Sequence, residues 1–146
     1  VNPALRIMHI NATTYEVMDY HQFYTSVPTF PDLPSTDHGP VFNYLYSARA
    51  AYGNFTASNA NSSHPVAGGV WPETAPLNAT FWAKLTEEMG VRKELVQQFT
   101  VYQGRNSPKS PKCLTDECVQ AKICYMQSGS AILGKQCIQG YGSVQS

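Results

Sequence analysis

The sequence predicts an α+β protein, with a β-hairpin at its N-terminal end and a mainly helical, disulfide-stapled region after it. Two runs, 2–10 and about 15–24, read as strands and lie close enough to pair across a short turn. From residue 41 onward, apolar residues recur at helical spacing. All four cysteines fall within the last 34 residues, where disulfides can hold short helices together.

The first strand of the hairpin has apolar residues on both of its faces. Leu5 and Ile7 point to one side, and Met8 and Ile10 point to the other. A strand of this kind suits a sheet that is covered on both faces, and a two-stranded ribbon alone is marginally stable in water. We therefore expect the hairpin to belong to a larger sheet, and the chain to be the C-terminal part of a bigger protein.

A proline-rich strap and a series of short helices are expected after the hairpin. Four prolines between residues 26 and 40 favour a stiff, extended connector. Pro40 suits the first position of a helix and Gly53 its C-terminal cap, which predicts a helix over 41–52. A second helix is expected to end at Gly90. The helices after the first are expected at about 80–89, 92–103, 115–127 and 130–137.

These elements divide the chain into four expected parts. They are the last strands of a larger domain (1–25), the strap (26–40), a helical domain (41–139) and a flexible tail (140–146). A polar loop over 54–76 interrupts the helical domain, and loops of this length are uncommon unless they are functional or mobile.

Charge and hydropathy exclude some classes of partner. Lys and Arg together number 10 and balance 10 Asp and Glu, and charged residues make up 14% of the chain. We therefore expect no nucleic-acid partner and no electrostatic attraction to anionic lipid. No apolar run is long enough to span a bilayer. The first residues lack the pattern of a signal peptide, so we expect any targeting sequence to lie upstream or to have been removed.

Four N-glycosylation sequons indicate the compartment. They begin at Asn11, Asn54, Asn61 and Asn78, and none has Pro in the middle. With 8 Asn and 23 Ser or Thr among 146 residues, chance predicts roughly one such sequon. We therefore favour a secreted or lysosomal/vacuolar glycoprotein over chance matches in a cytosolic protein.

The cysteines are expected to form two disulfides. A zinc site more often shows Cys-x2-Cys pairs or accompanying His, and neither occurs in this stretch. The Cys-x-x-Cys motif of redox catalysis is also absent. Three connectivities are possible, and we favour the sequential one. It joins Cys113 to Cys118 and Cys124 to Cys137.

No motif for nucleophilic or metal-dependent catalysis occurs in the chain. Asp19 and His21, on one face of the second strand, come closest to a site, and we favour a solvated or locally hydrogen-bonded pair. Arg6 stands among apolar strand residues. We expect it to pair with an acid outside this chain, with snorkelling to solvent as the alternative.

The many aromatic residues are expected to form mostly core. Trp71 is the exception, because it lies inside the long loop, where burial is not guaranteed. Two roles are open for it: contact with lipid, or cover over an active-site cleft.

Several of these motifs, in this order, resemble the end of acid sphingomyelinase-like phosphodiesterases of the calcineurin-like metallophosphoesterase superfamily. Asn-Pro-x-x-Arg precedes a strand, a sequon-bearing turn and a tyrosine-rich strand, and a strap then leads to Tyr-x-Ala-Arg. The closing cysteine run also has the spacing of acid sphingomyelinases. The matching residues are Asn2, Pro3, Arg6, Tyr15, Val17, Asp19, Tyr20, Phe23, Tyr24, Tyr46, Ala48, Arg49, Tyr52, Gly53 and the four cysteines.

The resemblance implies a phosphodiesterase with two zinc ions, whose parent reaction is the hydrolysis of sphingomyelin to ceramide and phosphocholine. Its metal ligands and catalytic residues lie upstream of Asn2, so the resemblance implies no catalytic residue, metal ligand or cofactor in this chain. The hairpin would form the edge of the metallophosphoesterase sheet. The expected partner is the upstream catalytic domain, and a lipid or membrane surface is a second one.

Within this resemblance, the motif residues Asn2, Pro3, Arg6, Tyr46 and Arg49 are expected to have structural roles. Two other functions remain open at the level of sequence. One is a related metallophosphoesterase acting on nucleotides or polyphosphate, since a C-terminal segment does not define the head group. The other is a non-catalytic secreted module that binds lipid or another protein.

Overall fold

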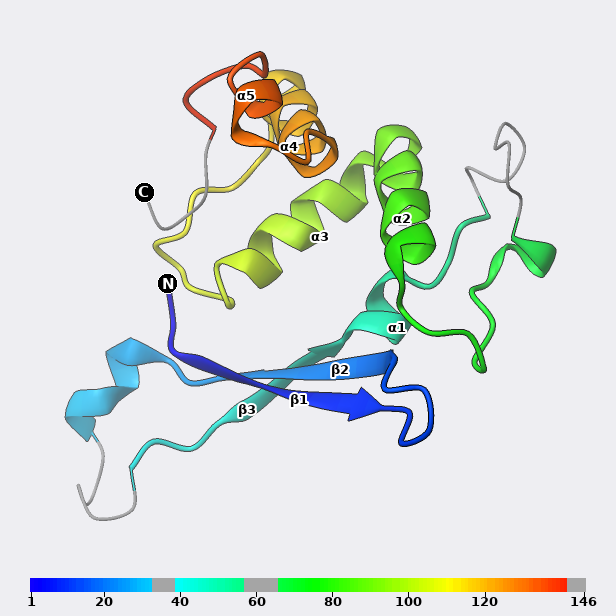
Figure 1. The fold of residues 1–146 in the computed structure, drawn as a ribbon. Helices are drawn as coiled ribbons and strands as arrows, with labels where there is room; N and C mark the ends of the chain where they lie inside the picture. The colour runs from blue at the N-terminus through cyan, green and yellow to red at the C-terminus, as the bar shows by residue number, and fades with distance from the viewer. Residues whose placement is uncertain (33–38, 57–65, 142–146) are drawn as a thin grey trace.

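A layer of helices lies on one face of a three-stranded antiparallel sheet (Figure 1). The computed structural model describes residues 1–32, 39–56 and 66–141. The predicted α+β class, with an N-terminal sheet, helices after it and two disulfides, is confirmed. The strands are β1 (Ala4–Ile10), β2 (Val17–Tyr24) and β3 (Asn43–Ser47). The helices are α1 (Ala48–Tyr52), α2 (Ala79–Val91), α3 (Lys93–Gln103), α4 (Asp116–Gln127) and α5 (Ala131–Gly134), with the 3₁₀ segments η1 (Val27–Asp32) and η2 (Ala67–Gly69).

The predicted hairpin forms, because β1 pairs antiparallel with β2 along its whole length. Asn11 orders the turn between the strands. Its backbone N–H donates to the carbonyl of Glu16 at 2.9 Å, and its side-chain Oδ1 accepts from the N–H of Thr13 at 2.9 Å. An Asn side chain stabilises a turn in this way because its carbonyl replaces a backbone carbonyl.

The helix predicted over 41–52 is wrong in its first part, because residues 43–47 form β3. β3 pairs antiparallel with β2, from Ser47 opposite His21 to Asn43 opposite Tyr24. The aromatic residues of this segment fit a helical face and also suit a half-buried strand. Pairing with β2 decides between the two, and periodicity alone does not contain this information.

Helix α1 begins only where the chain leaves the sheet. Ser47 caps it, since its Oγ accepts from the N–H of Ala50 at 3.2 Å. Gly53 ends it as predicted, and its N–H donates to the Arg49 carbonyl at 2.8 Å. A Cβ at position 53 would lie 2.6 Å from that carbonyl oxygen, so the close approach requires glycine.

A β-bulge between Gln22 and Phe23 places Tyr44 and Tyr46 on opposite faces of the sheet. On one side of the bulge Tyr46 lies opposite Gln22, and on the other side Tyr44 lies opposite Phe23. Tyr46 therefore faces the helices, whereas Tyr44 packs on Phe23 on the opposite face, with ring centroids 5.5 Å apart.

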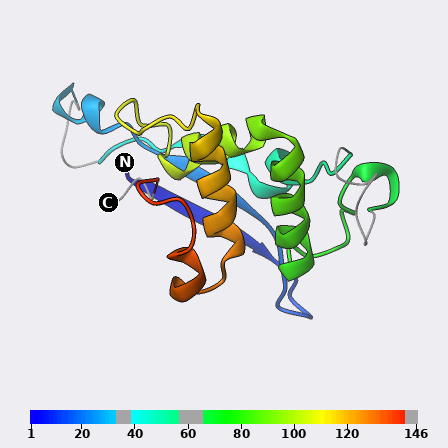
Figure 2. The ribbon, with the colours of Figure 1, turned by 90° about the horizontal axis from the view of Figure 1, so that it is seen from above.

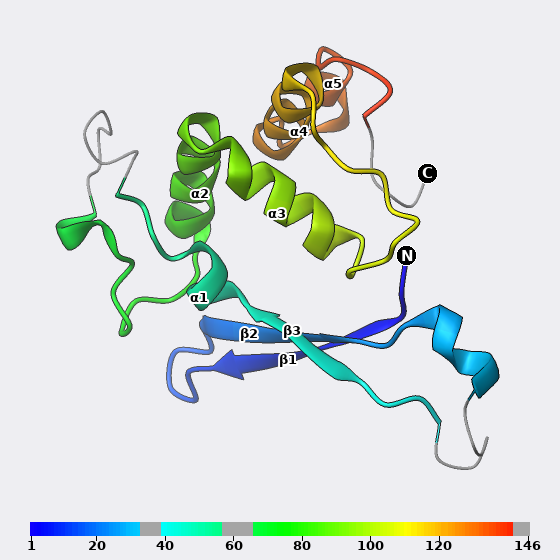
Figure 3. The same ribbon diagram turned by 180° about the vertical axis from the view of Figure 1, so that it is seen from behind.

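Helices α2, α3 and α4 all lie over the face of the sheet that carries Tyr46 (Figures 2 and 3). No helix or strand among the described residues covers the opposite face. Ile7 and Tyr44, on this face, are each 55% exposed, and Leu5 is 40% exposed. β1 is also an edge strand, and Met8 on its helix-facing side is 48% exposed. Both faces of β1 are thus apolar and open.

The helices predicted over 80–89, 92–103 and 115–127 are confirmed with small changes of boundary, whereas the one predicted over 130–137 is the four-residue α5. Gly90 does not end α2, because the helix continues to Val91 and the N–H of Arg92 still donates to the Glu88 carbonyl at 2.8 Å. Thr115 caps α4 through its Oγ1, which accepts from the N–H of Cys118 at 3.2 Å.

The core lies between the sheet and the helix layer and continues between the helices. Phe55, Phe81 and Met89 are completely buried there. The prediction that the aromatic residues form core is confirmed for Tyr46, Tyr52 and Phe81. It is wrong for Tyr44 and Phe42, which are exposed.

Both disulfides have the predicted sequential pairing. Cys113–Cys118 joins the segment before α4 to its first turn. Cys124–Cys137 joins the last part of α4 to the segment after α5. Together they fix α4 and α5 to each other and to the preceding loop.

The connecting segments are only partly as predicted. The strap is not extended throughout, because η1 forms over Val27–Asp32; proline is compatible with the first turn of a helix. Residues 33–38 of the strap, 57–65 of the long loop and 142–146 of the tail lie outside the described residues. The first residue of the long loop pairs with a later part of the same loop, in an isolated β-bridge between Asn54 and Val70.

Candidate functional site

A cavity of about 250 Å³ lies between the helix-facing side of the sheet and the helices above it. Strands β2 and β3 and helix α1 supply one wall, and helices α2, α3 and α4 supply the other. The lining side chains are almost all aromatic or aliphatic. They are Tyr20, Tyr46, Tyr52, Trp82, Leu85, Thr86, Met89, Phe99 and Met126.

Stacked tyrosines build the sheet-side wall of this cavity. The rings of Tyr46 and Tyr102 stack with an interplanar angle of 3° and centroids 4.0 Å apart. Tyr20 meets Tyr46 edge-on, and the two hydroxyl oxygens share a hydrogen bond of 3.1 Å. The hydroxyl of Tyr102 accepts from Nε2 of Gln98 at 2.9 Å. These contacts fix the rings, so the wall is largely preformed.

Tyr52 is the exception in this cluster. It is 3% exposed, and its hydroxyl has no hydrogen-bond partner among the described residues. Burial raises the pKa of Tyr52 well above its ordinary value, and the neighbouring phenols of Tyr46, Tyr20 and Tyr102 raise it further. Tyr52 is therefore neutral at physiological pH, and its O–H is available as a donor.

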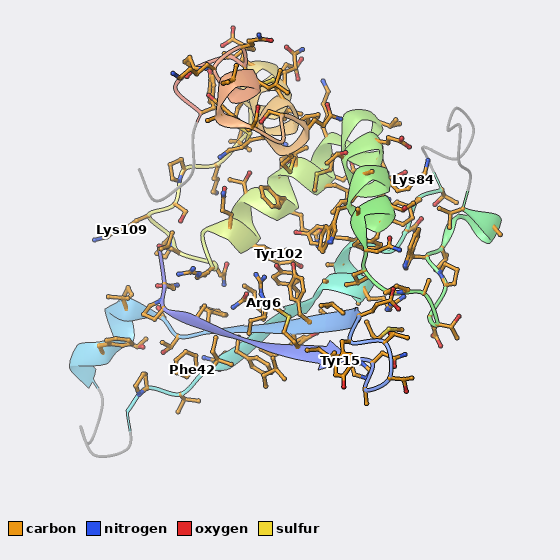
Figure 4. All side chains as sticks on the ribbon, viewed as in Figure 1. Arg6, Tyr15, Phe42, Lys84, Tyr102 and Lys109 are labelled. Atoms are coloured by element: carbon orange, nitrogen blue, oxygen red, sulfur yellow. A yellow bond between two sulfur atoms is a disulfide. The ribbon has the colours of Figure 1, made fainter. Side chains whose placement is uncertain are left out.

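Arg6 brings a positive charge to the edge of the tyrosine cluster. Its guanidinium carbon lies 4.0 Å from the centroid of the Tyr20 ring, and its Nε donates to Oε1 of Gln22 at 3.0 Å. Figure 4 shows this side chain rising from β1 toward Tyr102 on α3. The predicted ion pair with an acid outside this chain remains a prediction. Within the described residues, no carboxylate lies within 4.0 Å of this guanidinium.

The sequence did not predict this cavity. The abundance of tyrosine near Tyr20 and Tyr46 was the available signal, and it indicated core packing rather than a hollow. The bulge that turns Tyr46 toward the helices depends on the register of β2 and β3, which the sequence pattern does not specify.

Asp19 and His21, the closest candidate for a catalytic pair, belong to the scaffold. The carboxylate of Asp19 accepts from Oγ of Ser47 at 2.6 Å and from the backbone N–H groups of Tyr20 at 2.7 Å and Arg49 at 3.0 Å. Nε2 of His21 lies farther away, at 3.9 Å. The interpretation of these residues as solvated or locally hydrogen-bonded is confirmed: Asp19 has local hydrogen bonds, and the side chain of His21 is 43% exposed.

These contacts also set the protonation of Asp19. Burial alone raises the pKa of this carboxyl group, but hydrogen bonds from Ser47, Arg49 and Tyr20 outweigh burial. The pKa of Asp19 is therefore lowered from its ordinary value of 3.8. The carboxylate stays ionised at neutral pH, as its acceptor role requires.

Arg49, from the Tyr-x-Ala-Arg segment, ties the sheet to the long loop. Its guanidinium donates to the carbonyl of Met18 through Nη2 at 2.6 Å and Nε at 3.2 Å. It also donates to the carbonyls of Pro72 at 2.7 Å and Ala75 at 2.6 Å. One side chain thus binds three carbonyl groups from two separate segments.

The remaining motif residues lie at the other end of the sheet. Asn2 is buried, and its side chain contacts both the loop after α3 and the start of η1. Pro3 is exposed, and its carbonyl accepts from the N–H of Thr25 at 3.1 Å. The structure therefore places Asn2, Arg6, Tyr46 and Arg49 at separate positions along the sheet, and only Tyr46 lines the cavity.

Trp71, in the long loop, packs against the edge of the hydrophobic core. Its ring lies against Phe55 and Phe81, with centroids 6.1 Å and 5.4 Å away, and its Nε1 donates to the Pro76 carbonyl at 3.1 Å. The side chain is half-buried. The predicted contact with lipid or with a substrate cleft stays a prediction.

Three of the four sequons share one arrangement. In Asn11, Asn54 and Asn78 the side-chain Oδ1 accepts a backbone N–H from two or three residues further on. Within the described part of the chain, the side-chain hydrogen bonds of these three residues leave the amide nitrogen unused, and this nitrogen is the atom that carries an N-linked glycan. Asn61 lies outside the described residues.

Neither a metal-ligand cluster nor a membrane span is found in the described ranges. No three His, Cys, Asp or Glu side chains of residues 1–32, 39–56 and 66–141 gather where a metal ion could be held. His38 and His64 lie outside these ranges. None of the helices in the same ranges has both the length and the apolar character of a membrane span.

Comparison with known families, with curated proteins and with solved structures finds no match to this chain. The functional conclusion therefore depends on the residues and their geometry.

Proposed function

We propose that this chain is the C-terminal structural portion of a secreted or lysosomal/vacuolar acid sphingomyelinase-like phosphodiesterase. The observation that carries the proposal is β1, an edge strand with apolar side chains exposed on both faces. Such a strand is an aggregation hazard in a protein that stands alone. It is well suited to the interior of a sheet that continues into another part of the same protein.

The ordered motifs give this missing part an identity. In acid sphingomyelinase-like enzymes, a segment like Asn2 to Tyr24 closes the metallophosphoesterase sheet, and a helical domain with four cysteines follows. On this basis, the three strands lie at the edge of that sheet, with β1 paired to an upstream strand and β3 outermost. The parent enzyme would hydrolyse sphingomyelin to ceramide and phosphocholine with two zinc ions, which activate a water and bind the phosphate.

The roles of the motif residues support a scaffolding function for this chain. Arg49 and Asp19 bind backbone groups of neighbouring segments, and Asn2 binds the loop after α3. These contacts fix the helical layer to the sheet, so they would hold it at the border of the upstream domain. In this proposal the metal ligands and catalytic residues lie upstream, and the chain binds no cofactor itself.

The proposal is tested on the natural protein, purified with an antibody raised against this chain. Intact mass and a reducing gel give its length, elemental analysis gives its zinc content, and labelled sphingomyelin reports hydrolysis. We expect a larger glycoprotein with two zinc ions that releases phosphocholine. A stable monomer of only these 146 residues, without activity, would overturn the proposal and favour a non-catalytic module.

The same preparation distinguishes the substrate classes. Activity on a nucleotide or on polyphosphate, with none on sphingomyelin, would keep the metallophosphoesterase assignment and replace the substrate. A protein that contains zinc but acts on none of these substrates would contradict both the substrate and the metallophosphoesterase assignment.

A surface variant tests the contact with the upstream part directly. Ile7→Lys places a charge on the open face of β1, and we expect it to lower the secreted yield and the melting temperature of the parent protein. Ile132→Lys is the matched control, because Ile132 is 77% exposed on α5, far from the sheet in the sequence. If both variants behave like the wild type, the open face of β1 is not a contact surface.

A further inference from the structure

The cavity between the sheet and the helices contains a hydrogen-bond donor that the fold does not use. Tyr52 lines the cavity, it is 3% exposed, and its hydroxyl has no partner among the described residues. A buried hydroxyl without a partner is unfavourable. Its neighbours do not explain it, because the hydroxyls of Tyr20 and Tyr46 bond to each other. A molecule that places a hydrogen-bond acceptor beside this hydroxyl would therefore gain binding free energy, because it removes the cost of the unpaired group.

The rest of the lining suits an aliphatic chain. Leu85 and Met89 of α2, Phe99 of α3 and Met126 of α4 meet around the hollow. Two of these residues are methionines, whose flexible side chains adapt to an occupant. Small-molecule sites are typically apolar cavities with a few fixed polar groups, and this cavity has that composition.

The charge near the cavity favours an acidic head group. No charged side chain lines the cavity. Arg6 stands against the ring of Tyr20, one of the lining residues, and its Nε is bonded to Gln22. Its two terminal nitrogens make no hydrogen bond within the described part of the chain. A planar guanidinium with two free nitrogens is the group best shaped to bind a carboxylate.

We propose that this cavity binds a small amphipathic carboxylate. Its aliphatic chain lies between Leu85, Met89 and Met126, and its carboxylate accepts from the hydroxyl of Tyr52 and pairs with Arg6. This site does not depend on the proposed function, since it is built entirely from residues of this chain.

An ordered water is the competing occupant, because a water also satisfies a buried hydroxyl. The two occupants differ in what they require. A water needs neither an aliphatic wall nor a cation, whereas an amphipathic carboxylate needs both.

The test is a calorimetric titration of the protein, in the length in which its source makes it, with hexanoate, hexanol and acetate. Hexanol keeps the chain and lacks the charge, and acetate keeps the charge and lacks the chain. We expect hexanoate to bind at least about tenfold more tightly than either, since it alone uses both parts of the site.

Three variants locate the binding. Tyr52→Phe removes only the hydroxyl, and Arg6→Gln removes the charge; each is expected to weaken hexanoate about tenfold. Tyr102→Phe is the matched control, because the Tyr102 hydroxyl belongs to the same cluster but already accepts from Gln98. It should bind hexanoate like the wild type. Circular dichroism confirms that each variant is folded.

Several outcomes would overturn the proposal. They are no detectable binding of hexanoate, equal binding of hexanol, or unchanged binding in both Tyr52→Phe and Arg6→Gln. A crystal structure grown with hexanoate that shows only a water at the Tyr52 hydroxyl would assign the site to water instead.

Discussion

Asn2 and Arg105 bind each other's backbone across 103 positions of the sequence. Nδ2 of Asn2 donates to the Arg105 carbonyl at 3.0 Å, and Nη1 of Arg105 donates to the Asn2 carbonyl at 3.1 Å. Oδ1 of Asn2 also accepts from the N–H of Val27 at 3.2 Å. Asn2 is only 2% exposed, so this reciprocal pair joins the start of β1 to the loop after α3 in a buried position.

Asn2→Ala is therefore expected to lower the free energy of unfolding by about 2–3 kcal/mol, because it leaves the Arg105 carbonyl and the Val27 N–H without the partner that Asn2 supplies. Urea unfolding measures the change. Asn43→Ala is a matched control, since Asn43 is exposed at the start of β3 and its loss should cost within about 0.5 kcal/mol. Equal stability of the two variants would mean that the Asn2 contacts contribute nothing.

Asn78 combines a helix cap with a glycosylation sequon. Its Oδ1 accepts from the N–H of Phe81 at 3.2 Å, which caps α2, and Thr80 completes the sequon. In a host that does not glycosylate, Asn78→Ala should destabilise the protein by about 1 kcal/mol, whereas Asn78→Asp should keep the cap. Thermal unfolding measures both.

In a glycosylating host the same residue gives a different pattern. Asn78→Asp and Thr80→Ala should both lose one glycan, seen as one step of mobility on a gel, although only the second keeps the asparagine. If Thr80→Ala keeps the glycan mass, Asn78 is not the attachment site. If Asn78→Asp destabilises as much as Asn78→Ala, the cap assignment is wrong.

Asp19 is expected to make the folded protein less stable as the pH falls into the acid range. Its pKa in the folded protein is lowered from 3.8, so the unfolded chain binds a proton more readily than the folded one. The contribution of Asp19 is fully present above its ordinary pKa and is lost as the pH falls through the lowered value. Melting temperatures from about pH 6 to about pH 2 should show this loss.

Asp19→Asn removes the titrating group and isolates its share of the pH dependence. The variant should be less stable than the wild type near neutral pH and should approach it in acid. His21→Gln is the control. Nε2 of His21 lies 3.9 Å from the carboxylate, and its charge has the smallest effect on the pKa of Asp19. A constant difference between Asp19→Asn and the wild type at all pH values would contradict this role.

Much of the fold follows from local signals in the sequence. The hairpin, α3, α4 and the disulfide pairing depend on strand-like runs across a short turn, helical spacing, caps and cysteine order, which are all short-range features. β3 does not, because residues 43–47 suit a helix and a strand alike until β2 is available to pair with them. Whether such a segment becomes a strand depends on the neighbouring strands of the sheet and not on its own sequence alone.

The site is less predictable than the fold for a similar reason. Tyr20, Tyr46 and Tyr102 come from β2, β3 and α3, and they meet only after the bulge has turned Tyr46 toward the helices. The Arg49 contacts are likewise long-range, since its partners lie 23 to 31 residues away. A sequence motif can indicate that such a residue has a structural role, but it does not predict which groups the residue contacts.

The two disulfides are expected to contribute unequally to stability. Cys124–Cys137 closes a span of 13 residues, and Cys113–Cys118 closes a span of 5. Loop entropy predicts about 3 kcal/mol for the first and about 2 kcal/mol for the second. Paired Cys→Ser variants, compared by urea unfolding without reductant, test the order. A larger loss from the Cys113 and Cys118 pair would show that loop entropy is not the deciding factor.

Tyr52→Phe and Tyr20→Phe remove the same atom from neighbouring rings and should have opposite effects on stability. The hydroxyl of Tyr52 is buried without a partner among the described residues, so its removal should raise the free energy of unfolding by about 1 kcal/mol. The hydroxyl of Tyr20 bonds to Tyr46 at 3.1 Å, so its removal should lower that free energy by about 1 kcal/mol. Thermal unfolding of both variants in ligand-free buffer measures the pair. A loss of stability in Tyr52→Phe would show that its hydroxyl already has a partner, such as a bound water.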